Sequence, residues 1–305
     1  MTKKVAISIG DLNGIGIELA LKNHALISKS ITPIYCIDDA MLQQTAQKLN
    51  LTIPTDFQTI ENIAPSFEIN PGEISKESGA YAYASFVKAV TLAKEGKVDA
   101  ICTLPIHKKA WELAGVSYKG HTDALRDFFD ANAIMMLGCE KMYVALFTEH
   151  IPLKEVAKNI KEKELTKFLL DFYTTAKPTK EVAVLGLNPH AGDGGVLGNE
   201  ESIIKEAIES VHKILNKKVF TQPLVPDVAF TPNVRKKYTH YIAMYHDQGL
   251  TPLKTLYFDE GINISLNLPI LRTSVDHGTA FDIAYKGVEL NNLSYLNAID
   301  YIVKH

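Results

Sequence analysis

Three histidines each follow an apolar stretch that has the composition of a buried strand. His150 follows residues 144–148, His190 follows residues 182–187, and His246 follows residues 242–245. Ligands of parallel α/β sheets collect at the carboxyl ends of the strands, where the three imidazoles would converge. Three protein ligands that leave further positions open are typical of a catalytic divalent-metal site. A single histidine after a strand is usually an ordinary polar loop residue, but the repetition of this pattern favours a metal site.

Two of these histidines have informative neighbours. His190 lies in the polar, glycine-rich segment 188–195, and loops of this kind on rigid strands often carry function. Asp247 follows His246 directly, so its carboxylate could orient the imidazole. The alternative for Asp247 is a helix N-cap or turn residue.

The segment 10–16, Gly-Asp-Leu-Asn-Gly-Ile-Gly, follows a predicted strand and opens a predicted helix. Its glycines would let the backbone approach a ligand, and the free amides of a helix start favour an anion. The glycine spacing does not fit the G-x-G-x-x-G dinucleotide fingerprint. A tight strand-to-helix turn without a ligand is therefore an equal alternative.

Two further segments could bind a polar or anionic substrate. His121 and Thr122 lead into a helix predicted over residues 124–129, and Thr122 or Asp123 could simply be its N-cap. Arg272 follows the apolar residues 269–271. A buried arginine needs an anionic partner, either a substrate phosphate or carboxylate or an internal carboxylate.

The rest of the sequence predicts the elements that position these residues. Strands are expected over residues 4–9, 34–37, 100–103, 182–187, 241–245 and 262–266, with a hairpin over 134–137 and 142–148. Helices are expected over residues 17–23, 39–49, 75–95, 153–160, 163–174, 200–215 and 293–303. This alternation predicts an α/β fold with a largely parallel sheet covered by helices.

The length of 305 residues exceeds the size of most single cores and favours two domains. Because no flexible linker is visible, the second domain is expected to be inserted into the first, with residues 1–125 and 270–305 in one domain and 126–269 in the other. The net charge of -3 leaves no basic surplus for nucleic acid. The N-terminal apolar run is too short for a signal peptide, and no stretch is long enough to span a membrane, so a cytoplasmic protein is expected.

Taken in order, these motifs resemble the 4-hydroxythreonine-4-phosphate dehydrogenase family of pyridoxal phosphate biosynthesis over essentially the whole chain. The residues that carry the resemblance are the turn 10–16, Gly120-His121-Thr122, Thr148-Glu149-His150, the segment 188–194, the segment 245–250 and the segment 272–280. The segment from His277 to Asp282 is also similar to the cofactor loop of isocitrate and isopropylmalate dehydrogenases. One departure is Asp11-Leu12-Asn13, where many relatives carry Glu-Pro-Ala or similar.

The resemblance implies a fold of two α/β domains with a cleft between them, and a homodimer whose metal ligands come from both subunits. It assigns the metal to His150, His190 and His246, and the substrate to His121, Thr122, Lys254, Asn263 and Arg272. The NAD or NADP cofactor is assigned to Gly14, Gly16, His277, Gly278, Thr279 and Asp282. Lys254 and Asp247 are the candidates for catalysis. Zinc is the favoured metal, with magnesium or cobalt as alternatives.

The implied reaction oxidises 4-phosphohydroxy-L-threonine to a β-keto acid that decarboxylates to 3-amino-2-oxopropyl phosphate. Related dehydrogenases act on threonate or erythronate 4-phosphate or on dihydrodiol carboxylates, and the shared motifs do not separate these substrates. Outside the oxidoreductases, three histidines could serve a metallohydrolase or a non-catalytic metal-binding module, neither of which would need the loop from His277 to Asp282.

Overall fold

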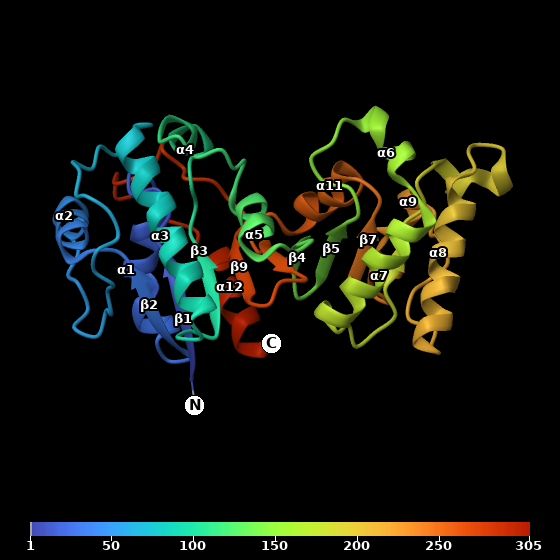
Figure 1. The fold of residues 1–305 in the computed structure, drawn as a ribbon, viewed down its shortest axis with the longest axis horizontal. Coiled ribbons are helices and arrows are strands. Elements are labelled where there is room, and N and C mark those ends of the chain that lie inside the picture. Colours follow the sequence, from blue (N-terminus) through green and yellow to red (C-terminus); the bar gives the residue numbers. More distant parts are fainter. Residues whose placement is uncertain (1) are drawn as a thin grey trace. The chain divides into compact units, whose positions relative to one another are not determined.

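The computed structural model describes residues 2–305, and their contacts divide the chain into two compact units. Unit 1 comprises residues 2–131, Ile262–Ile264 and Leu268–His305, and unit 2 comprises Asn132–Gly261 and Ser265–Asn267. The sequence-based boundaries at residues 125 and 269 lie a few residues from these divisions. Both units combine strands with covering helices (Figure 1), as expected for an α/β protein.

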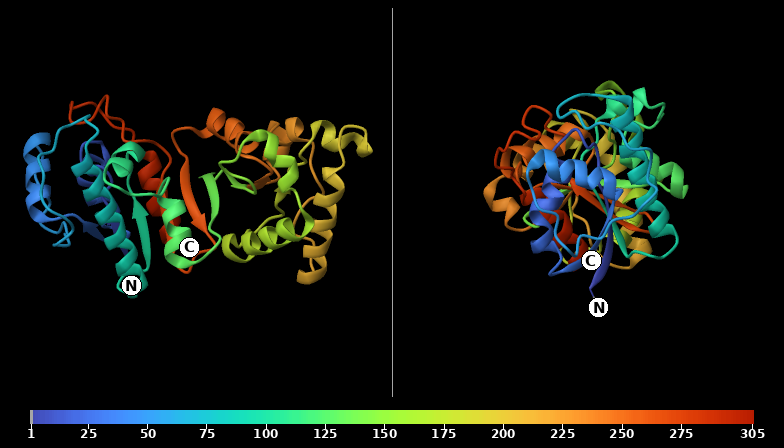
Figure 2. Two further views of the ribbon diagram at one scale, coloured as in Figure 1. Left: turned by 45° about the horizontal axis from the view of Figure 1, so that its top comes forward. Right: turned by 90° about the vertical axis from the view of Figure 1, so that its left-hand side faces the viewer.

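Unit 1 is built on four neighbouring strands in the order β2 (Ile31–Cys36), β1 (Lys3–Ser8), β3 (Ala100–Thr103) and β9 (Leu271–Val275). All three pairings are parallel. The helices of this unit are α1 (Gly16–Ile27), α2 (Asp39–Leu49), α3 (Lys76–Lys94), α4 (Lys108–Leu113), α5 (His121–Phe129) and α12 (Leu293–Lys304). The first and last elements, β1 and α12, both belong to this unit (Figure 2).

Helix α3 illustrates how the sequence sets an element of unit 1. The Ser75 side chain accepts a hydrogen bond of 3.0 Å from the Ser78 amide, which caps the first turn. Phe86 and Val90 are buried on the face that packs on the strands, whereas Tyr83 and Val87 are only partly buried. Gly96 adopts a φ of +66° just after the helix, which suits a C-terminal stop.

Unit 2 contains the predicted hairpin and a short parallel array. Strand β4 (Ile134–Cys139) pairs antiparallel with β5 (Met142–Leu146), and the parallel neighbours β5, β7 (His240–Ala243) and β6 (Ala183–Val184) follow. Its helical segments are α6 (Leu153–Asn159), α7 (Glu162–Ala176), η1 (Pro189–Gly195), α8 (Glu200–Leu215), α9 (Pro226–Ala229), α10 (Pro232–Arg235) and α11 (His246–Tyr257). Helices α7 and α8 lie side by side in Figures 1 and 2. The last strand, β8 (Ile262–Leu266), contributes residues to both units.

Several predicted elements differ from the structure. The strand predicted over residues 182–187 is regular only at Ala183 and Val184, and it continues as isolated bridges from Val182 and Leu185. Strand β9 and helices α4 and α11 were not predicted as such. No helix within residues 2–305 is long and apolar enough to cross a membrane.

Candidate active site

The three candidate metal ligands all lie in unit 2, after neighbouring parallel strands. His150 follows β5, His190 follows β6, and His246 is the first residue of α11 after β7. Since β7 pairs in parallel with both β5 and β6, the carboxyl ends of the three strands meet at one edge. The elements therefore place the three histidine segments at the edge where α/β sheets bind their ligands.

Two of these imidazoles lie next to each other. The ring centroids of His150 and His246 are 5.4 Å apart, with 44° between the ring planes. Two imidazoles that share one ion at nitrogen–metal distances near 2.0–2.1 Å have centroids roughly 5 Å apart. The spacing of this pair therefore fits two ligands of one metal ion.

Asp247 orients the His246 ring. The His246 Nδ1 donates to the Asp247 Oδ1 over 2.9 Å, which leaves Nε2 as the nitrogen for a metal. The alternative of a helix N-cap is wrong, because the N-cap of α11 is Tyr245 and Asp247 lies in the first turn.

His190 lies in a loop of unusual backbone conformation. Residues 190–194 all have φ values between +43° and +77°, and three of them are not glycine. Each L-residue in the left-handed region costs roughly 1–2 kcal/mol, so other contacts must hold this loop. Within residues 2–305, no group of three His, Cys, Asp or Glu side chains gathers as a metal site. Within the described residues, one chain thus brings together His150 and His246 but not all three candidate ligands.

Lys254 and Asn263 occupy separate elements. Lys254 lies two turns after His246 on α11, with its Nζ 5.9 Å from the centre of the Phe258 ring. Asn263 belongs to the part of β8 assigned to unit 1, and its Oδ1 atom is buried with no hydrogen-bond partner found in the described part of the chain.

Arg272 is a buried cation in unit 1. It lies on β9 with 2% of its surface exposed, and its Nη2 donates to the Thr103 hydroxyl over 2.7 Å. Burial lowers the pKa of Arg272 to about 10, so the guanidinium remains charged at neutral pH. Thr103, the last residue of β3, was not singled out from the sequence.

His121 is a buried imidazole near this cation. It contacts the rings of Phe86 and Trp111 edge-on, with centroid distances of 4.8 Å and 5.3 Å. Burial lowers the pKa of His121 well below its usual range, and the charge of Arg272 acts in the same direction. Its Nε2 atom is buried and finds no hydrogen-bond partner among residues 2–305. The site thus offers a neutral imidazole beside a permanent cation.

The interpretation of Thr122 or Asp123 as an N-cap is wrong. Helix α5 begins at His121 and its N-cap is Gly120, so His121 and Thr122 both lie in the first turn. The Asp123 carboxylate instead accepts a hydrogen bond of 3.1 Å from the Lys119 amide. Thr122 is buried at a helix start, where free amides favour an anion.

The turn 10–16 and the loop from His277 to Asp282 are in contact. The Ile15 amide donates to the Thr279 carbonyl over 3.1 Å. A Cβ added to Gly14 would lie 2.8 Å from that same oxygen, and one added to Gly16 would lie 2.9 Å from the Ile9 carbonyl oxygen. Both glycines are therefore required by close backbone packing. In the loop, Thr279 is buried and Asp282 is exposed.

Asn13, part of the departure from the family pattern, has a structural role. Its side-chain Nδ2 donates to the Glu73 carbonyl over 2.8 Å, and its Oδ1 accepts from the Asn70 backbone amide over 3.0 Å. These bonds join the turn to the loop at Gly72, whose amide donates to the Asn13 carbonyl. A second contact missed in the sequence is the stacking of His107 on Phe281, with centroids 5.0 Å apart.

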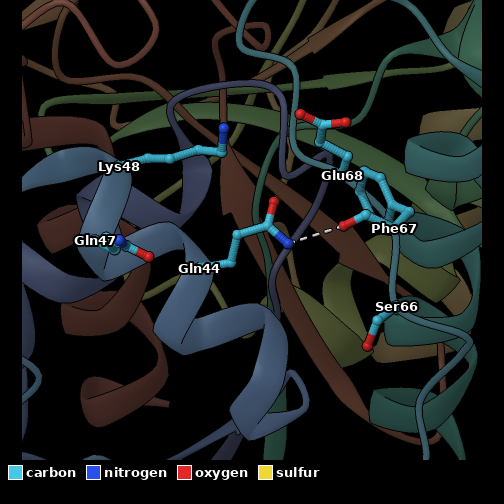
Figure 3. Close-up of a pocket in the computed structure, with 6 residues that line it drawn as sticks. All are labelled: Gln44, Gln47, Lys48, Ser66, Phe67 and Glu68. Atoms are coloured by element: carbon cyan, nitrogen blue, oxygen red, sulfur yellow. Dashed lines mark hydrogen bonds between the residues drawn. The ribbon is translucent and has the colours of Figure 1, made fainter.

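An open surface pocket in unit 1 is separate from these residues. It is lined by Gln44, Gln47, Lys48, Ser66, Phe67 and Glu68 (Figure 3). The Gln44 side chain donates to the Phe67 carbonyl and accepts from the Ile69 amide. These two bonds fix the backbone of residues 67–69 to α2. None of the candidate site residues lines this pocket.

The model of the family described as pyridoxal phosphate biosynthetic protein PdxA matches residues 29–302. The chain belongs to the PdxA family. A 4-hydroxythreonine-4-phosphate dehydrogenase from Sulfurimonas denitrificans is 59% identical to this chain over 296 residues, covering 97% of the chain and 95% of the relative.

Solved structures agree with this membership in the PdxA family. A 4-hydroxythreonine-4-phosphate dehydrogenase from Klebsiella pneumoniae superposes with a TM-score of 0.82 at 31% identity, covering 99% of this chain and 98% of that one. The isocitrate dehydrogenase from Methylococcus capsulatus gives a TM-score of 0.50 at 14% identity, covering 100% and 86%. The second likeness concerns the fold alone, and it confirms the predicted α/β class.

Proposed function

We propose that this chain is a 4-hydroxythreonine-4-phosphate dehydrogenase. It would oxidise 4-phosphohydroxy-L-threonine to 2-amino-3-oxo-4-phosphooxybutanoate, which decarboxylates to 3-amino-2-oxopropyl phosphate in pyridoxine 5'-phosphate biosynthesis. The observation that carries this proposal is the 59% identity, over 97% of the chain, to a relative with that name. The positions of the candidate residues support it.

His121, Thr122 and Arg272 are assigned to the substrate phosphate. A phosphate needs fixed positive charge and hydrogen-bond donors on rigid elements. Arg272 provides the charge from a buried strand, and Thr122 lies in the first turn of α5, where backbone amides are free. The uncharged state of His121 leaves one ring nitrogen to donate and the other to accept.

His150, His190 and His246 are assigned to one divalent metal ion, zinc most favourably. The spacing of the His150 and His246 rings and the bond from His246 to Asp247 support this role. When bound, such an ion supplies Lewis acidity that lowers the pKa of the substrate hydroxyl. His190 would be contributed by the partner subunit of a homodimer.

The remaining groups bind the cofactor and move a proton. The turn at Gly14 and Gly16 and the loop from His277 to Asp282 would hold NAD or NADP, which supplies the hydride acceptor. Lys254 would take the proton from the 3-hydroxyl as a general base. Asn263 would bind the substrate.

The test is the near-ultraviolet absorbance of NADH or NADPH. Purified protein is mixed with 4-phosphohydroxy-L-threonine or threonate 4-phosphate, each cofactor, and zinc, cobalt or magnesium. Reduction with 4-phosphohydroxy-L-threonine at the higher kcat/KM supports the proposal. Turnover of threonate 4-phosphate alone would assign the chain to a paralogous activity, and no reduction with any pair would refute a dehydrogenase. A cytoplasmic location stays a prediction, which cell fractionation checks.

A further inference from the structure

The left-handed loop that carries His190 is anchored by one buried carboxylate. Glu201 lies in the first turn of α8 with 4% of its surface exposed. Its Oε1 accepts from the Leu187 and Asn188 amides over 2.9 Å and 2.6 Å, and its Oε2 accepts from the Asn188 side-chain amide over 3.0 Å. Hydrogen bonds to an ionised carboxylate are stronger than those between neutral groups. Glu201 therefore fixes the two residues from which the loop starts.

The same carboxylate also lies close to the middle of the loop. A Cβ added to Gly192 would lie 2.6 Å from the Glu201 Oε2, so the loop backbone passes directly over this oxygen. Gly192 has a φ of +77° between non-glycine residues that are also left-handed. The left-handed backbone of His190 and Ala191 costs free energy, so contacts such as those of Glu201 must offset that cost.

A second side chain ties this loop to the segment that carries His246. The Gln248 Nε2 donates to the Gly186 carbonyl over 2.6 Å, and its Oε1 accepts from the Met244 amide over 2.7 Å. The Met244 carbonyl in turn accepts from the Thr148 hydroxyl over 2.6 Å. Thr148 and Met244 lie two residues before His150 and His246, respectively. One hydrogen-bonded network thus connects all three histidine segments.

We propose that Glu201 and Gln248 are positioning residues for the histidine site. Glu201 holds the His190 loop in its left-handed conformation, and Gln248 fixes the base of that loop to the start of α11. This inference rests on the proposed role of the three histidines in metal binding. Neither residue is assigned as a metal ligand, and both would act through the backbone that presents the imidazoles.

The substitution Glu201→Gln tests the first half of the inference with little change in shape. Its amide oxygen can keep the two backbone bonds, but its NH₂ group then faces the NH₂ group of Asn188, which already donates to Glu200. The matched control is Glu206→Gln, the same change at an exposed position of the same helix.

The measurements are the dissociation constant for Zn²⁺, from competition with a chromophoric chelator, and amide hydrogen exchange of residues 187–198 in metal-free protein. For Glu201→Gln we expect the dissociation constant to rise about 10- to 100-fold, as for other residues that orient metal ligands. Exchange in the loop should also become faster, and Glu206→Gln should match the parent in both measurements. Parental Zn²⁺ affinity in a folded Glu201→Gln protein would overturn the role of Glu201.

The variant Gln248→Met removes both hydrogen bonds of the Gln248 side chain and keeps a side chain of similar length. It tests the second half of the inference by itself, including the case in which Glu201→Gln does not fold. It should weaken Zn²⁺ binding in the same range. His190→Ala distinguishes a wrong metal assignment from a wrong positioning role. If His190→Ala keeps stoichiometric Zn²⁺, the metal assignment is wrong and the positioning role falls with it. If His190→Ala loses Zn²⁺ while Glu201→Gln and Gln248→Met bind it normally, only the positioning role is wrong.

Discussion

Replacing Arg272 by lysine tests whether this buried cation binds the substrate phosphate or only supports the sheet. Because its pKa remains near 10 in the folded protein, Arg272 is charged at neutral pH, and lysine preserves that charge. Lysine cannot present the planar guanidinium fork that matches a phosphate. It also loses the bond to Thr103. The substitution therefore removes the internal bond to Thr103 and, in the proposed substrate complex, at least one bond to the phosphate.

The two losses have separate magnitudes. A hydrogen bond to a charged group contributes about 1.5–3 kcal/mol. At 1.4 kcal/mol per factor of ten, loss of one substrate bond lowers kcat/KM roughly 10- to 150-fold. Loss of the Thr103 bond lowers the stability of unit 1, and the melting temperature falls by roughly 2–4 °C for each kcal/mol in a domain of this size.

The variant Thr103→Val isolates the internal bond. It leaves the guanidinium in place, so it should lower the melting temperature as Arg272→Lys does but reduce kcat/KM much less. Arg235→Lys is the control for a structural arginine, because Arg235 donates to the Phe230 carbonyl and the Tyr257 hydroxyl in unit 2. Initial rates at varied substrate concentration and thermal unfolding supply both readouts. If Arg272→Lys leaves KM unchanged while its melting temperature falls as in Thr103→Val, Arg272 belongs to the scaffold.

Three further predictions follow from the site. His190→Ala should lose bound metal and nearly all turnover with an unchanged circular dichroism spectrum; stoichiometric metal at normal rates would contradict the assignment. Mixing His190→Ala with His246→Ala should restore part of the activity if the two ligands come from different subunits, and no recovery despite subunit exchange would place all ligands in one chain. Burial raises the pKa of Asp11 to about 6, above its unfolded value near 4, so folding stability should fall as pH rises through this interval. Asp11→Asn should abolish that fall in urea unfolding; an unaltered pH profile would exclude Asp11 as its source.

Local signals predicted many elements of the fold well. Helices α2 and α8 and strands β3 and β8 have the predicted bounds, because each has an uninterrupted periodic or apolar pattern. Helix α11 was missed, since Gly249 and Pro252 argue against a helix. The structure explains that glycine: a Cβ there would lie 2.4 Å from the Val144 Cγ1. Close packing on β5 thus requires a residue that lowers helix propensity.

The candidate site was predictable to the extent that its residues follow strand ends. The three histidines could be grouped because parallel strands present their carboxyl ends together. The bond between Arg272 and Thr103 joins residues 169 positions apart, and nothing near either residue indicates the pairing. Glu201 and Gln248 were missed for a related reason, because a carboxylate at the start of α8 and a side-chain amide in α11 have many ordinary roles.

The distribution of the candidate groups determines which measurement reports on which residues. The assigned phosphate and cofactor residues belong to unit 1, whereas the three histidines and the network of Glu201 and Gln248 belong to unit 2. A change at Arg272 should therefore alter KM while leaving the metal content intact. A change at Glu201 should lower metal affinity in the absence of any substrate. A variant of Arg272 that lost metal, or a variant of Glu201 that changed only the substrate KM, would contradict this separation and with it the assignment of both groups.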